Sequence, residues 1–199
     1  MLRKIDKSIL YALIAVVCWS TVATAFKIAL SGMSFLVLLA ISSFVASVSL
    51  FIVLIWSKKI NKIRELSLKT VAFLSFKGAL NPFLYYLILF KAYDLLPAQE
   101  ALILNYTWPI ILVVFSIIFL KQKVLMFDIP SVIISFFGVF IIATKGDFTN
   151  IEFENGFGTF LALISSIVWA LYWILNLKTK EDSTVQLFIG FSTGFLLTS

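Results

Sequence analysis

The residues best suited to bind a ligand are aromatic and polar side chains that recur at helical spacing inside long apolar segments. Four of them stand at i, i+3, i+4 and i+7 and so share one narrow face of a helix: Trp169, Tyr172, Trp173 and Asn176. Trp19 stands in a similar stripe near the start of the chain. Such a stripe either packs against lipid or a neighbouring helix, or forms the wall of a substrate cavity. We expect Trp19, Trp169 and Tyr172 to line a cavity.

A second group of candidates lies in the middle of the chain. Glu100, Asn105 and Trp108 fall within a wedge of about 140° at about 100° per residue, so they face a similar direction. Tyr106 points elsewhere by the same count, and we include it among the cavity candidates. Two interpretations of Glu100 stay open. Its carboxylate either complements the positive end of the helix that begins there, or pairs with Lys27 or a substrate ammonium group.

The third group combines polar side chains with helix-breaking prolines. Asn81 and Tyr85 are further cavity candidates, and Lys77 precedes them at the same spacing of four. Lys77 lies about two turns from the end of its segment, so we expect its ammonium group to reach the membrane surface. Pro82 and Pro109 each remove a backbone hydrogen bond, and we expect an interruption at both. The Asn81–Pro82 pair then either acts as a hinge or lines the cavity.

The residue types exclude most enzymatic chemistry. The chain has no histidine and one cysteine, so a His-based triad, a His-based metal site and an internal disulfide are excluded within this sequence. It also has no phosphate-binding loop and no zinc-ligand spacing. We therefore expect no catalytic residues, no metal and no cofactor.

The candidates are carried by seven long apolar segments. Hydrophobic residues make up 61% of the chain and charged residues only 13%, against about 25% charged in an average soluble protein. A helix needs about 20 apolar residues to cross ~30 Å of hydrocarbon. The sequence therefore predicts an all-α polytopic membrane protein with about seven transmembrane helices. We expect them at 8–30, 34–57, 70–93, 97–119, 127–145, 155–176 and 184–199.

The basic residues between the segments predict the orientation. Twelve Lys and Arg residues flank the segments on one side and three flank them on the other. By the positive-inside rule the richer side, with the N-terminus, is cytoplasmic in an inner or plasma membrane. The net charge of +6 lies in short loops, so its expected partners are anionic lipid headgroups and not nucleic acid. The first segment is longer than a signal peptide needs, and we expect it to be retained.

An internal repeat divides the chain into two units. Trp19 and Trp169 stand 150 positions apart, each in the middle of its segment. We predict a first unit of five helices in 1–146 and the start of a second unit in 155–199. A unit with an odd number of spans places its second copy upside down, which is typical of secondary transporters. The second copy is incomplete, so we expect a longer protein with about three further helices.

Four runs carry a family resemblance. They are Leu13–Lys27, Phe83–Lys123, Gly138–Ala143 and, within the second of these, Asn105–Pro109. Together they resemble the drug/metabolite transporter superfamily of EamA type, and the run Asn105–Pro109 is similar to the branch that includes the bacterial aromatic amino acid exporter. The resemblance implies ten helices in two inverted five-helix repeats, and movement of small metabolites without nucleotide hydrolysis.

The predicted cavity and the resemblance together indicate a secondary transporter. We expect it to export small organic metabolites such as aromatic amino acids by alternating access at a mid-membrane site. Export, as opposed to import, rests on the resemblance alone. Two alternatives stay open: a transporter of another metabolite or a drug, and a non-transporting membrane subunit or scaffold that pairs with another chain. A homodimer is compatible with each of these interpretations.

Overall fold

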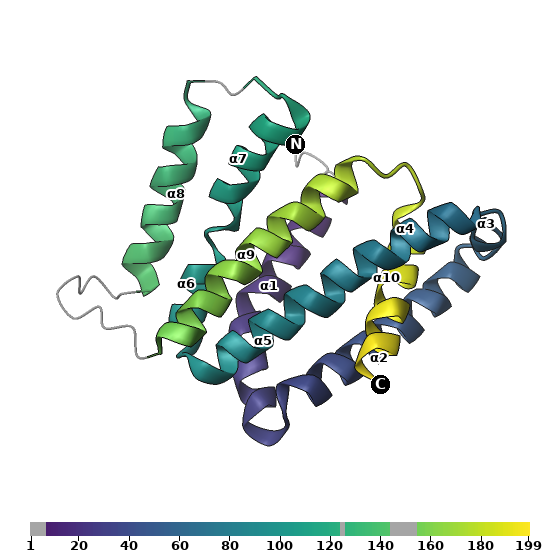
Figure 1. Ribbon diagram of the computed structural model, residues 1–199, viewed down its shortest axis with the longest axis horizontal. Helices are drawn as coiled ribbons and strands as arrows, with labels where there is room; N and C mark the ends of the chain where they lie inside the picture. The colour runs from purple at the N-terminus through teal and green to yellow at the C-terminus, as the bar shows by residue number, and fades with distance from the viewer. Residues whose placement is uncertain (1–6, 124–125, 144–154) are drawn as a thin grey trace, which may run out of the picture.

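The computed structural model describes residues 7–123, 126–143 and 155–199, and every regular element within these ranges is a helix. The α-helices and one π-helix (η1) follow in the order α1 (Lys7–Gly32), α2 (Phe35–Trp56), α3 (Asn61–Arg64), α4 (Leu68–Gly78), η1 (Ala79–Leu84), α5 (Tyr85–Leu95), α6 (Ala98–Asn105), α7 (Trp108–Leu120), α8 (Asp128–Ala143), α9 (Gly156–Leu177) and α10 (Ser183–Thr198). Figure 1 shows their arrangement. The predicted all-α polytopic membrane fold is confirmed.

All seven predicted segments are helical, close to the expected bounds. Within the described residues, five stretches are long and apolar enough to cross a membrane: Ile9–Gly32, Phe35–Trp56, Leu68–Leu95, Ala98–Leu120 and Gly156–Leu177. The remaining two, α8 and α10, have 16 residues each. At 1.5 Å per residue each is about 24 Å long, less than the ~30 Å of a full crossing. Among the described residues, five of the seven predicted segments thus reach the length of a full crossing, and α8 and α10 are apolar helices of shorter described length.

Polar side chains fix where four of the helices begin. The side-chain oxygens of Ser34, Ser67, Asn155 and Asp182 each accept a hydrogen bond from a backbone N–H in the first turn that follows, at 3.4, 3.1, 2.9 and 3.0 Å. Such N-caps satisfy backbone donors that the helix itself leaves unpaired, which matters at a membrane boundary. These caps therefore set the register of the apolar stretches that follow.

Two of the spans are interrupted next to proline, as predicted. In η1, Asn81 leaves the helical conformation with φ −148° and ψ 120°, and its peptide bond to Pro82 is cis. In the next span α6 ends at Asn105 and α7 begins at Trp108, with Pro109 as the second residue of α7. The expected kink at Pro109 is thus a break in the turn just before it.

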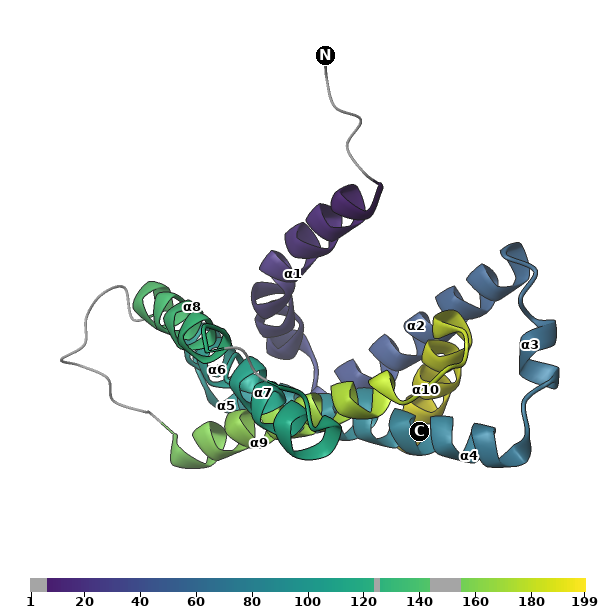
Figure 2. The ribbon, with the colours of Figure 1, turned by 90° about the horizontal axis from the view of Figure 1, so that it is seen from above.

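α9 lies between other helices at the centre of the view in Figure 1. α5 lies beside α9, and α6 and α7 pack against α9 from the other side (Figure 1). α10 packs on α2, α4 and η1. Figure 2 shows α1 standing out from these helices, and its contacts are with α5, α6 and α2. Successive spans alternate in direction, so α1 and α9 run in opposite senses.

Small residues let α10 approach the interrupted span closely. A Cβ added at Gly78 would lie 2.6 Å from the carbonyl oxygen of Gly190, and one added at Gly194 would lie 2.7 Å from Cγ of Pro82. On the α2 side of α10, the hydroxyl groups of Ser47 and Ser192 are hydrogen-bonded at 2.7 Å. Glycine and serine are typical of helix contacts in membranes, because they allow the backbones to meet.

Candidate functional site

A cavity of about 220 Å³ lies between α1, α5, α6, α7 and α9. Eight of its twelve lining side chains are aromatic, and the described residues that line it include no charged one. Trp19 is 59% exposed, so the cavity is open on the α1 side. We call it the aromatic cavity; its lining residues are Trp19, Val22, Phe26, Tyr85, Tyr86, Leu89, Tyr93, Leu102, Asn105, Tyr106, Trp108 and Trp169.

A stack of rings holds Trp169 in place. Its indole stacks on Tyr85 with ring centroids 4.6 Å apart and on Tyr172 with centroids 5.9 Å apart. Tyr85 in turn meets Tyr86 edge-on at 4.8 Å. Aromatic pairs of this kind contribute about 0.5–1.5 kcal/mol each beyond the area they bury. The Tyr85–Trp169 pair therefore helps to hold α5 against α9 at the cavity.

Asn105 is the polar centre of the aromatic cavity. It is buried, its Oδ1 accepts a hydrogen bond from the Tyr85 hydroxyl at 3.4 Å, and its Nδ2 donates one to Ser165 Oγ at 2.9 Å. Next to this bond, the hydroxyl groups of Thr107 and Ser166 are hydrogen-bonded at 2.8 Å. These bonds join α5 and the α6–α7 break to α9. A primary amide has a second N–H and a second oxygen lone pair, which leaves Asn105 able to bind a ligand as well.

The structure brings six of the nine predicted site residues together at this cavity. They are Trp19, Tyr85, Asn105, Tyr106, Trp108 and Trp169. Tyr106 was placed on a different face by counting along one continuous helix. The break between α6 and α7 falls at Tyr106 itself, with φ −68° and ψ 6°, so consecutive side chains on either side of it can both reach the cavity.

The other three predicted residues lie elsewhere. Asn81 is buried in η1 and, among the described residues, its Oδ1 has no hydrogen-bond partner. Glu100 accepts a hydrogen bond from the Thr159 hydroxyl at 3.4 Å, near the start of α9. Tyr172 lines a separate pocket towards the other end of α9.

Sequence reasoning missed six lining residues: Val22, Phe26, Tyr86, Leu89, Tyr93 and Leu102. A usable signal was present for most of them. Tyr86, Leu89 and Tyr93 stand at i, i+3 and i+7, and Phe26 follows Trp19 by seven residues, so each set shares a helix face.

Lys27 fixes the end of α1 against α5. Its Nζ donates hydrogen bonds to the backbone carbonyl oxygens of Tyr93 and Leu96 at 2.6 and 2.7 Å. The last carbonyl groups of a helix carry a partial negative charge, which a lysine complements. This contact holds α1 beside α5 and so positions Trp19 and Phe26 at the cavity.

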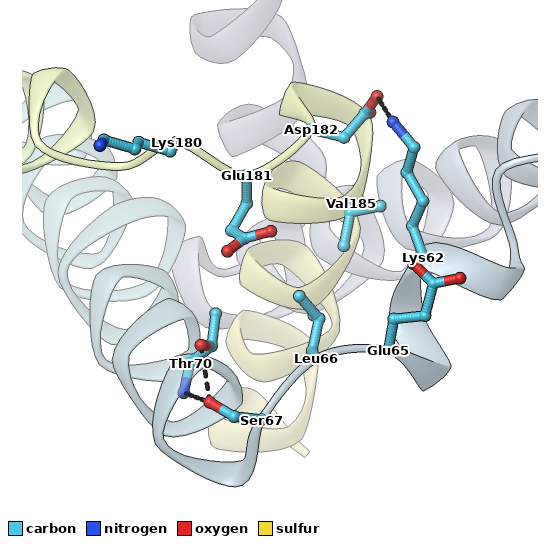
Figure 3. A pocket seen from close by; sticks show the side chains of 9 residues that line it. All are labelled: Lys62, Glu65, Leu66, Ser67, Thr70, Lys180, Glu181, Asp182 and Val185. Carbon is cyan, nitrogen blue, oxygen red and sulfur yellow. Dashed lines mark hydrogen bonds and ion pairs between the residues drawn. The ribbon is translucent and has the colours of Figure 1, made fainter.

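A larger pocket of about 500 Å³ lies between the segment that joins α3 to α4 and the segment that joins α9 to α10, and it is lined by residues of 62–70 and 180–185. Figure 3 shows its polar lining and the ion pair of Lys62 with Asp182. Asp182 Oδ2 lies 2.9 Å from Lys59 Nζ and 3.0 Å from Lys62 Nζ. The hydrogen bonds from these lysines, and that from the Thr184 N–H, hold the pKa of Asp182 well below its usual value. This cluster ties the loop before α4 to the loop before α10.

The aromatic cavity is the better candidate for a binding site, because it lies between spans and not among loops. Its chemistry is non-covalent: planar apolar surfaces, an amide and several hydroxyl groups. Within the part of the chain that the structure describes, no group of three or more His, Cys, Asp or Glu side chains is placed to hold a metal ion.

The chain matches a known protein family over most of its length. The EamA-like transporter family matches the chain over residues 6–144, which cover α1 to α8 and with them most of the aromatic cavity. No curated protein and no solved structure matches the sequence.

Proposed function

The chain belongs to the EamA-like transporter family and is therefore a membrane transporter; we propose that it exports small aromatic metabolites, such as aromatic amino acids, through the aromatic cavity. Six predicted substrate contacts line that cavity: Trp19, Tyr85, Asn105, Tyr106, Trp108 and Trp169. Asn81, Glu100 and Tyr172 would then act at other points of the pathway.

The observation that carries the proposal is the combination of ring surfaces with one buried amide. An apolar cavity of about 150 Å³ is large enough to bind benzene. At about 220 Å³, the aromatic cavity has room for a six-membered ring and a small polar group. Asn105 supplies the directional hydrogen bonds that such a polar group needs, while stacking holds the ring.

The depth of the two tryptophans supports a site near the middle of the membrane. Trp19 lies 12 residues after the start of α1, and Trp169 lies 13 residues after the start of α9. At 1.5 Å per residue these depths are about 18 and 20 Å. Because α1 and α9 run in opposite directions, the two side chains approach one level from opposite surfaces. This is the relation expected if 1–146 and 155–199 belong to inverted repeats.

In this proposal the substrate alternates between the two surfaces as the units rock against each other. The contact between the units consists of the packing of α9 on α5, α6 and α7 and the packing of α10 on α2, α4 and η1. The ion pairs of Asp182 lie among basic loops that we assign to the cytoplasmic side of an inner or plasma membrane. The N-terminus lies on the same side.

Exchange in liposomes tests the proposal. The protein is reconstituted, loaded with labelled phenylalanine, tyrosine or tryptophan, and its efflux is compared with that of labelled alanine and leucine. We expect exchange of the aromatic amino acids to be faster. Replacing Trp108 and Trp169 together by alanine removes two rings, which at about 0.5–1.5 kcal/mol each should lower transport at limiting substrate by roughly 5- to 150-fold.

Trp56→Ala is the matched control. Trp56 is 83% exposed at the end of α2 and does not line the cavity, so its loss should leave exchange unchanged. Thermal midpoints in detergent show whether each variant is folded. Equal exchange of aromatic and aliphatic amino acids, or full activity in a folded double variant, would contradict the proposal.

A further inference from the structure

Lys77 is a buried cation inside a membrane span. It lies nine residues after the start of α4, or about 13 Å along the helix, and only 3% of it is exposed. Its ammonium group donates to Thr179 Oγ1 at 3.0 Å and to Gln186 Oε1 at 2.7 Å, and it lies 5.8 Å from the ring centroid of Tyr172. The expectation that it reaches the membrane surface is correct only in part. The group extends to the level of the α9–α10 loop, but it is covered by protein there.

The charge of Lys77 has no counter-charge among the described residues. Both hydrogen-bond acceptors are neutral, and no carboxylate oxygen in the described ranges lies within 4.0 Å of its Nζ. The aspartates that do form ion pairs, Asp94 and Asp182, bind other lysines. A buried charge without a partner is costly, and in a membrane protein such a group usually faces a pathway.

All three groups that contact Lys77 line one pocket. This pocket has a volume of about 320 Å³, and we call it the polar pocket; its lining residues are Tyr172, Trp173, Asn176, Thr179, Glu181, Ser183, Gln186 and Leu187. Gln186 is held in one orientation, because its Nε2 donates to the backbone oxygen of Glu181 at 2.7 Å while its Oε1 accepts from Lys77. Glu181 belongs to the same lining, and it also lines the larger pocket between residues 62–70 and 180–185. The lining of this pocket therefore includes an acidic residue, Glu181, and two polar side chains that are hydrogen-bonded to the Lys77 ammonium group.

The polar pocket is connected to the aromatic cavity by stacked rings. Tyr172 lines the polar pocket and stacks on Trp169, and Trp169 lines the aromatic cavity and stacks on Tyr85. A ligand that carries both a ring and charged groups could place its charged groups in the polar pocket and its ring against Tyr172 and Trp169. The ring would have aromatic contacts at each step from one pocket to the other.

We propose that the polar pocket is the loop-side subsite for an amino-acid zwitterion, in which Lys77 binds the carboxylate and Glu181 binds the ammonium group. The substrate carboxylate replaces a neutral acceptor of Lys77 and supplies the missing negative charge. This inference rests on the proposed transport of aromatic amino acids and adds the groups that recognise the charged part of the substrate.

Competition binding with the reconstituted protein tests the assignment. Labelled phenylalanine is displaced by unlabelled phenylalanine, by phenylalaninamide, which lacks the carboxylate, and by 3-phenylpropionate, which lacks the ammonium group. Hydrogen bonds to charged groups are strong enough that each missing charge should weaken binding by about 10- to 100-fold. Lys77→Met should lower the affinity for phenylalanine to that of the amide and leave the amide unchanged. Glu181→Gln should lower the affinity for phenylalanine to that of 3-phenylpropionate and leave the affinity for 3-phenylpropionate unchanged.

Lys69→Met is the matched control, because Lys69 lies on α4 as well but is exposed. It should leave all three affinities unchanged. Lys77→Arg keeps the charge and should keep the preference for phenylalanine over the amide. If a folded Lys77→Met variant weakens phenylalanine and the amide equally, or retains the preference, Lys77 only joins α4 to α10 and the inference is wrong. The proposed function is unaffected by that result as long as the wild-type protein exchanges aromatic amino acids. If the wild-type protein neither binds nor transports any aromatic amino acid, the proposed function is refuted as well.

Discussion

Replacing Gly78 by alanine tests the close crossing of α4 and α10. A methyl group at this position would lie 2.6 Å from the carbonyl oxygen and 2.7 Å from the Cα of Gly190. Both are backbone atoms, so neither can turn aside as a flexible side chain would. α4 and α10 must therefore separate or tilt. Such overpacking costs about 1–3 kcal/mol, against a gain of up to about 1 kcal/mol from replacing glycine in a helix.

The opposite substitution provides the comparison. A methyl group at Gly190 would have its nearest neighbour, the Cα of Gly78, at 3.6 Å, which is ordinary van der Waals contact. Gly190→Ala thus has the same gain in helix propensity without the clash. The difference in unfolding free energy between the two variants isolates the contact, and we expect it to be about 1–3 kcal/mol. For a chain of this length this corresponds to about 2–12 °C in thermal midpoint.

The assay is thermal unfolding in detergent, with Gly138→Ala as a third variant. Gly138 has no heavy atom within 4 Å of an added Cβ, so its replacement should not destabilise the protein. The order expected is Gly78→Ala lowest, with Gly190→Ala and Gly138→Ala at or above the wild type. Equal midpoints for the Gly78 and Gly190 variants would show that the crossing is looser than the structure has it, and the reasoning from this contact would fail.

Two further predictions concern charged side chains at the ends of the spans. The pKa of Asp182 is depressed in the folded state, so its ion pairs stabilise the protein above the usual carboxyl pKa of about 3.9, and this stability is lost as the pH falls towards the folded value. Asp182→Asn should therefore lower the thermal midpoint at pH 7 and flatten its decline between about pH 5 and 3; a decline as steep as that of the wild type would contradict this. Lys27→Met leaves the carbonyl groups at the end of α5 without their donor and should destabilise the protein by about 1–3 kcal/mol. Lys91→Met removes a pair with Asp94 within one helix and a cation–π contact with the Phe35 ring at 5.2 Å, each worth at most about 1 kcal/mol, and should cost less than Lys27→Met. Equal losses for the two lysine variants would refute the role of Lys27 as an anchor.

The spans were predictable because a membrane imposes a simple pattern on the sequence. Apolar length, flanking charges and proline position each act locally, so the ends of α2 and α9 fell within two residues of expectation. The burial of Lys77 was not predictable in this way. It depends on Thr179 and Gln186, which lie more than 100 residues away and form its surroundings only once α10 packs on α4. The close approach of Gly78 to Gly190 depends on the same long-range packing.

The site residues show where reasoning from helical phase holds and where it fails. α9 runs uninterrupted for 22 residues, so side chains that helical phase places on one face do lie together. Trp169 and Tyr172 stack on each other, and Trp169 lines the aromatic cavity while Tyr172 lines the polar pocket. At the α6–α7 break the phase is reset, so Tyr106 joins Asn105 in one cavity although a continuous helix would separate them. A proline inside a span thus predicts an interruption from sequence, but the direction of the side chains within one turn of it follows from the packing of the two half-helices. The positions next to such an interruption are where several side chains can converge on one ligand. In this protein they include Asn105, the polar centre of the aromatic cavity.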